Sequence, residues 1–135
     1  MGRRLVVAIT ALSIAHHLDH VVRQVTGWPL TGGVNAFSIS LLVYPVVAAG
    51  LVLSARRRVG VRFWAVLAGG GALFVAAVHF GPVAGDAVST IPDQHRSPAA
   101  DVLALGVVAA FFAVLVAHCV YETRLLIRAR AGRRA

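Results

Sequence analysis

The sequence of 135 residues contains no lysine, a single cysteine and only five acidic residues. Because Cys119 is the only cysteine, the sequence excludes an internal disulfide and any zinc or iron–sulfur site built from several cysteines. All 13 basic residues are arginines, and they lie between and beyond long apolar runs. For this reason the net charge of +8 does not indicate a nucleic-acid-binding protein, and we expect no nucleic-acid partner.

Charged residues are scarce as a class. They make up 13% of the sequence, whereas hydrophobic residues make up 59%. Soluble domains carry roughly 25% charged and about 45–50% apolar residues. A protein of this size could not bury so much apolar surface within itself, so we expect a lipid bilayer to cover it.

Four apolar stretches predict membrane-spanning helices, since a sheet with open edges is intolerable in lipid. The predicted spans are residues 5–25, 34–54, 62–80 and 101–121, followed by a basic tail at 122–135. Each has about the 20 residues that a helix needs to cross a bilayer. Ser97 and Pro98 precede the last span as a helix N-cap and a first-turn proline. We therefore predict one all-α domain over residues 1–135, an integral membrane protein built as a four-transmembrane-helix bundle.

The distribution of arginine predicts how the bundle is oriented. All of the 13 arginines except Arg23 and Arg96 lie on the side of the predicted bundle that holds both termini. An excess of arginine in the short segments between spans marks the cytoplasmic side of a membrane. We therefore expect the N- and C-termini in the cytoplasm.

The first span carries polar side chains along one face. At about 100° per residue, this face holds Ser13, His16, His17, Asp19, His20, Arg23 and Gln24. The opposite face is apolar throughout. Turning a charged residue toward lipid at mid-span would cost about 2.5–3.5 kcal/mol. The polar face must then line the bundle interior or a water-filled cavity, and its residues are candidates for a functional site.

The spacing of His16 and His20 indicates a metal site, because two imidazoles at i, i+4 share one helical face. Asp19 could add a ligand or orient an imidazole, and His79 lies at the matching depth of the third span. The predicted metal ligands are His16, Asp19, His20 and His79, with His17 and His95 as further candidates. Nitrogen and oxygen donors of this kind suit zinc, copper or iron. His118 lies about 20 Å away by helical rise and is not expected to take part.

Haem binding is a second cofactor hypothesis. His20 and His79 could ligate the iron from two helices, and glycines 69–71 of the third span would make room for the macrocycle. A haem would make the protein an electron carrier or a quinone-linked redox subunit.

A metal-free enzyme is a third hypothesis. Buried His17 and Asp19 could move protons on a lipophilic small molecule that enters from the bilayer, with Tyr44 as a further catalytic candidate. Tyr44 lies at mid-span beside Pro45, which removes a backbone hydrogen bond and is expected to free the carbonyl of Leu41.

A structural role is the fourth hypothesis. The polar face would then form a hydrogen-bond and ion-pair network, with Asp19 and Arg23 at i, i+4. The chain would serve as an accessory subunit of a larger membrane complex, or as a homo-oligomer. A transporter or channel is a further alternative. Together these alternatives leave open whether the protein is an enzyme.

The segment HHLDHVVRQVTGWPLTG, residues 16–32, resembles that of small membrane proteins of high-GC bacteria. The resemblance implies no family and no activity. We expect the protein to lie in the plasma membrane of a bacterium, its inner membrane.

Overall fold

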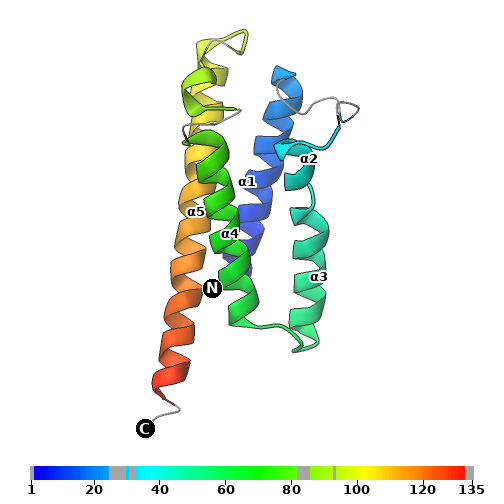
Figure 1. Ribbon diagram of the computed structural model, residues 1–135. Helices are drawn as coiled ribbons and strands as arrows, with labels where there is room; N and C mark the ends of the chain where they lie inside the picture. Colours follow the sequence, from blue (N-terminus) through cyan, green and yellow to red (C-terminus); the bar gives the residue numbers. More distant parts are fainter. Residues whose placement is uncertain (1, 25–29, 31–32, 82–85, 93, 133–135) are drawn as a thin grey trace.

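The computed structural model describes residues 2–24, 30, 33–81, 86–92 and 94–132. In this part of the chain the regular elements are all helical (Figure 1): α1 Gly2–Arg23, α2 Ala36–Ser40, α3 Val43–Ala55, α4 Val61–His79, the short 3-10 helix η2 Val88–Thr90, and α5 Pro98–Ala131. Four stretches are long and apolar enough to cross a membrane, namely α1, the α2–α3 pair, α4 and α5. The prediction of an all-α protein with four such helices is confirmed, and the orientation of the termini stays a prediction.

The tightest packing joins α5 to α4 and to α1 (Figure 1). Ala72 and Val75 of α4 meet Phe111 and Leu115 of α5 in one buried cluster, against which side chains of α1 pack. Large apolar side chains such as Val66 are exposed on the outer surfaces of the helices. An apolar exterior around a small core is the surface that lipid would cover.

The last helix is longer than the apolar run that predicts it. It begins at Pro98, with the Ser97 side chain accepting a hydrogen bond from the backbone N–H of Ala100, as the sequence predicts. It then continues past the expected boundary at residue 121 to Ala131. Residues 122–131 are mostly alanine, leucine, arginine and glutamate, which favour helix whether or not lipid surrounds them. Much of the predicted basic tail is therefore helical.

The second span is broken into α2 and α3 just before Pro45. The prediction that the Leu41 carbonyl is free is wrong, because this carbonyl accepts a hydrogen bond from the backbone N–H of Tyr44 at 3.2 Å. The tightened turn thus satisfies the group that Pro45 leaves without its usual partner. Ser40 and Tyr44 flank this break, and both contact α1 through His17.

At the opposite end of the second span, α3 approaches α4 through a glycine. A Cβ added at Gly50 would lie 2.4 Å from the Phe63 ring and 3.1 Å from the Trp64 ring. The Trp64 indole N–H also donates to the hydroxyl of Ser54 at 3.0 Å. Only a residue without a side chain fits between α3 and these rings.

Replacing Gly50 with alanine is expected to destabilise the bundle by about 1–3 kcal/mol, because the added methyl group forces the Phe63 ring out of its place. Gly106→Ala is the matched control, since a Cβ at Gly106 meets nothing within 4 Å. Thermal unfolding in detergent should show a lower midpoint for Gly50→Ala alone. Equal midpoints in the two variants would mean that α3 does not pack closely on α4.

Candidate metal centre

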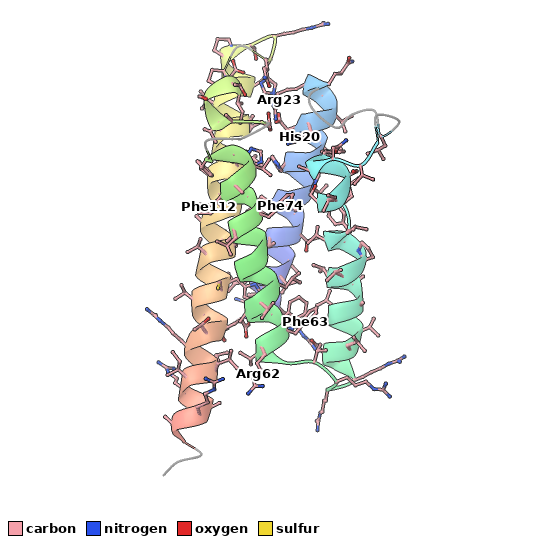
Figure 2. The ribbon with its side chains drawn as sticks, viewed as in Figure 1. His20, Arg23, Arg62, Phe63, Phe74 and Phe112 are labelled. Atoms are coloured by element: carbon pink, nitrogen blue, oxygen red, sulfur yellow. The ribbon has the colours of Figure 1, made fainter. Side chains whose placement is uncertain are left out.

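Three buried histidines meet near the end of the bundle where α1 and α4 end and α5 begins, called here the loop end (Figure 2). His16 and His20 come from successive turns of α1, and His79 is the last residue of α4. The Nε2 atom of His16 lies 3.2 Å from Nε2 of His20 and 3.2 Å from Nε2 of His79. The donor atoms of the three residues all lie within 4.8 Å of one another, so they could hold a metal ion.

The two distances from Nε2 of His16 are close to the ligand spacing of a small transition metal. With metal–nitrogen bonds of about 2.0–2.1 Å, two ligands of a tetrahedral ion lie roughly 3.3–3.4 Å apart. The ring of His79 is also held in the tautomer that a metal needs. Its Nδ1 atom lies 2.7 Å from the backbone carbonyl of Asp86, which can only accept a hydrogen bond, so the neutral ring presents an Nε2 lone pair.

Without a bound cation, the three neutral rings cannot satisfy one another. Suppose that Nε2 of His16 carries a proton and donates it to Nε2 of His79. The same N–H group then faces Nε2 of His20, which must be unprotonated to accept from it. An unprotonated Nε2 of His20, however, faces a carboxylate oxygen of Asp86 at 3.2 Å. If Nε2 of His16 is instead unprotonated, it faces the Nε2 lone pair of His79. Each arrangement pairs two like groups, and either a metal ion or one additional proton would remove the conflict.

Asp86 supplies a negative charge beside the three rings. The Arg23 guanidinium donates to both of its carboxylate oxygens, at 3.0 and 3.2 Å. Burial alone would raise the pKa of Asp86, but the hydrogen bonds from Arg23 and the nearby positive charge outweigh burial and hold this pKa below its usual range. The ionised carboxylate therefore favours a cation at the histidines.

Asp19, a predicted ligand, lies outside the three-histidine group. One of its carboxylate oxygens accepts from the Arg23 Nε–H at 2.7 Å, which is the expected i, i+4 pair. The other lies 2.8 Å from Nε2 of His95. Asp19 thus joins α1 to the segment before α5 rather than adding a donor beside the three imidazoles.

His95 bridges two carboxylates at the loop end. Its Nε2 contacts Asp19, and its Nδ1 lies 2.7 Å from Asp101 in the first turn of α5. Because carboxylates only accept, both contacts are satisfied when the ring carries two protons. The hydrogen bond to Asp101 and the one to Asp19 raise the pKa of His95, against a smaller opposing effect of burial.

His17 and Tyr44, two catalytic candidates, lie together in a second cluster. The Tyr44 hydroxyl is 2.8 Å from Nδ1 of His17, and Nε2 of His17 is 2.7 Å from the hydroxyl of Ser40. Nδ1 of His17 also lies 2.7 Å from the backbone carbonyl of Ser13. His17 is therefore adjacent to the metal candidates but bonded to other groups.

His118 lies outside both clusters, as the sequence predicts. It is buried on α5, where its Nε2 lies 3.2 Å from a carboxylate oxygen of Glu122, one turn farther along the helix. The ring of Trp64 stacks on it with a centroid distance of 6.3 Å. His118 is thus a buried histidine outside the candidate site, and its replacement can serve as a control for replacements within the site.

Haem fits the three-histidine site poorly. A haem iron held by His20 and His79 would have to lie between their Nε2 atoms, with the porphyrin ring around it. Nε2 of His16 lies 3.2 Å from both of these Nε2 atoms, which is where the ring would be. His16 would occupy the space of the porphyrin ring, so the arrangement suits a bare ion.

Comparison of the chain with protein-family models, with curated proteins and with solved structures found no match.

Sequence reasoning placed Asp86 only among the residues that could converge on the outer half of one cavity, and it missed Gln94. Both accept hydrogen bonds from Arg23. The spacing of Asp19 and Arg23 revealed their pairing, because both lie on one helix. No comparable signal connects Arg23 to Asp86, since the whole of α2, α3 and α4 lies between them in the sequence.

Replacing Arg23 with glutamine is expected to lower the stability of the protein by about 3–5 kcal/mol, because the buried carboxylate of Asp86 and the half-buried one of Asp19 lose their cation. Arg56→Gln is the matched control, since Arg56 is exposed at the opposite end of the bundle. Thermal or denaturant unfolding in detergent measures both variants. Similar stability of Arg23→Gln and the wild type would mean that Asp19 and Asp86 do not depend on this guanidinium.

Replacing His95 with glutamine should destabilise the protein in a pH-dependent manner. Because folding raises the pKa of His95, its bridge contributes fully below the usual histidine value of about 6.5, and the contribution is lost as pH rises through the raised value. The unfolding midpoint of the wild type should exceed that of the variant near pH 5.5, and the difference should shrink in alkaline buffer. A difference that does not change with pH would contradict an ionic role for His95.

Proposed function

We propose that the protein is an intramembrane metalloprotein in which His16, His20 and His79 bind one transition-metal ion. The observation that carries the proposal is the convergence of three buried Nε2 atoms at ligand distances. Two further features support it. The carbonyl of Asp86 fixes His79 in the ligating tautomer, and the side chain of Asp86 adds a negative charge nearby.

The donor set indicates the class of metal. Three neutral imidazoles suit zinc, copper or iron and give no advantage to magnesium or calcium, which prefer oxygen. Three protein ligands leave a further coordination position for water or a substrate. All three rings line the same cavity of the bundle. A metal at this position would supply Lewis-acid or redox chemistry to a molecule in that cavity.

The setting of this reaction is also part of the proposal. We place the protein in a bacterial plasma membrane. The excess of arginine at the opposite end of the bundle supports an orientation with the loop end outside the cytoplasm. In that orientation the ion would reach the site from the outer side.

Metal analysis of the purified protein, after supply of zinc, copper or iron, tests the proposal. The wild type should bind about one ion per chain, because three preorganised ligands hold it, and both His79→Ala and the double variant His16→Ala/His20→Ala should lose it. His118→Ala is the matched control, since it removes a buried histidine outside the site and should keep the ion.

Two results would overturn the proposal. One is substoichiometric metal in the wild type with all three metals, and the other is equal loss of metal from His118→Ala and His79→Ala. An absorption spectrum of the same preparations, scored for a Soret band, distinguishes haem from a bare ion. Absence of both would favour the accessory-subunit hypothesis, which copurification from native membranes would then test.

A further inference from the structure

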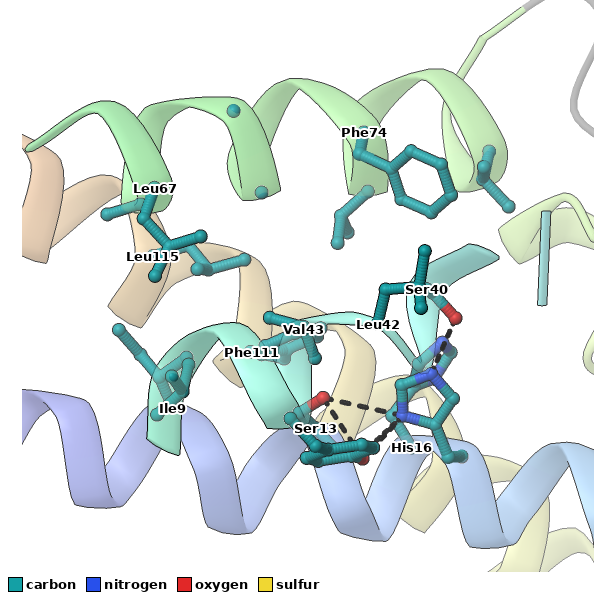
Figure 3. A pocket seen from close by; sticks show the side chains of 18 of the residues that line it. Ile9, Ser13, His16, Ser40, Leu42, Val43, Leu67, Phe74, Phe111 and Leu115 are labelled. Carbon is teal, nitrogen blue, oxygen red and sulfur yellow. Dashed lines mark hydrogen bonds between the residues drawn. The ribbon is translucent and has the colours of Figure 1, made fainter. Parts of the chain in front are cut away.

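A cavity of about 660 Å³ lies inside the bundle beside the three-histidine site. Its volume falls within the range of about 300–1,000 Å³ that is usual for pockets of small molecules. Figure 3 shows Ser13, His16 and Ser40 gathered toward one end of the cavity, and Ile9, Leu67 and Leu115 at the other. The cavity therefore has a polar end beside the candidate metal ligands and a long apolar remainder.

The polar end combines hydrogen-bonding groups with flat rings. The Tyr44 hydroxyl bonds His17 at 2.8 Å and lies 3.3 Å from the Ser13 hydroxyl. The His17 ring lies 5.5 Å from the Tyr44 ring and 5.4 Å from the Phe37 ring, measured between centroids. Hydroxyl donors between flat rings suit a planar head group that carries oxygen acceptors.

The charges around the cavity indicate an uncharged ligand. Among the described residues that line it, the only carboxylate is that of Asp86, and no arginine is present. The Asp86 carboxylate is already engaged by Arg23. Apart from the proposed metal ion, nothing in the described lining offers a free counter-charge to an anionic or a cationic head group, and an unpaired charge is costly in such surroundings.

The wall opposite the polar cluster offers open space at a glycine. Gly70 of α4 lines the cavity, and a Cβ added there meets nothing within 4 Å. Its neighbours Gly69 and Gly71, in contrast, face Cys119 and Leu115 on α5 at 3.2 and 3.3 Å. Helix packing accounts for Gly69 and Gly71, whereas Gly70 leaves room for a bound molecule.

From these features we propose that the cavity binds a quinone. The Tyr44 hydroxyl, held in place by Nδ1 of His17, donates a hydrogen bond to its carbonyl oxygen, and its lipophilic tail lies along the apolar walls of α3 and α4. A quinone combines the required properties, since it is flat, uncharged and lipophilic, and its oxygens accept hydrogen bonds. The proposal deepens the proposed function by naming the substrate class that meets the metal, although quinone binding itself needs no metal.

Binding of decyl-benzoquinone to the detergent-purified full chain tests this proposal, with decylbenzene as a probe that has the same tail but no oxygen. The cavity-filling variant is Gly70→Leu. Its matched control is Gly106→Leu, because Gly106 also has open space around its Cα, does not line the cavity and is exposed on α5. Tyr44→Phe removes one hydroxyl and keeps the ring.

Wild type and Gly106→Leu should bind the quinone equally, and Gly70→Leu should bind it at least about tenfold more weakly because leucine fills the space. Tyr44→Phe should weaken binding by roughly three- to tenfold, the usual effect of one lost hydrogen bond. Decylbenzene should bind far more weakly than the quinone. If Gly70→Leu fails to fold, Tyr44→Phe and the two probes decide the question without it.

Three results would overturn the proposal: no quinone binding to the wild type, unchanged binding in both Gly70→Leu and Tyr44→Phe, or equal binding of decylbenzene. The last would identify the cavity as a site for lipid acyl chains. Repeating the titration on chelator-treated wild type and on His79→Ala separates this proposal from the metal site. Quinone binding that is retained after loss of the metal would support this proposal independently of the metal, and quinone binding without any metal in the wild type would overturn the metal proposal alone.

Discussion

The buried Arg23 guanidinium connects the parts of the protein on which the site depends. It pairs with Asp19 on its own helix and with both oxygens of Asp86, a residue that follows α4. Asp86 in turn holds the His79 ring through its backbone carbonyl and lies against His20. Because a buried charge without its partner costs several kcal/mol, these contacts must form together. The Arg23 guanidinium thereby positions α1, Asp86 and two of the three candidate ligands, His20 and His79.

The inward face of α1 was predictable, because lipid permits only one placement for so many polar groups. His16 and His20 follow from that face and from their spacing. The partners from other elements were less predictable. Asp86 and His95 lie in a segment whose path depends on tertiary contacts, so the sequence could propose that they approach α1 but could not assign them. Asp19 shows the difference, since its carboxylate pairs with Arg23 and His95 instead of lying with the imidazoles.

The helix boundaries show a similar division. Hydropathy predicts where a chain can cross a bilayer, but helix formation depends on backbone propensity, so α5 continues to Ala131 through residues that would not remain in lipid. The break before Pro45 follows from its missing N–H. The repair of that break by Tyr44 does not, because a local 3-10 turn competes with a simple kink and leaves no mark in the sequence.

Incomplete hydrogen bonding separates the candidate metal centre from the rest of the polar interior. Arg23, Asp19, Asp86 and His95 satisfy one another, as a purely structural network would require. In the part of the chain that the structure describes, the buried side-chain nitrogens without a partner are Nδ1 of His16 and Nδ1 of His20. A protein that used these histidines only for packing would gain stability from replacing them with apolar residues. Their Nε2 atoms lie 3.2 Å apart, and Nε2 of His16 also lies 3.2 Å from Nε2 of His79, so the cation proposed above would give these two buried rings a role that packing alone does not.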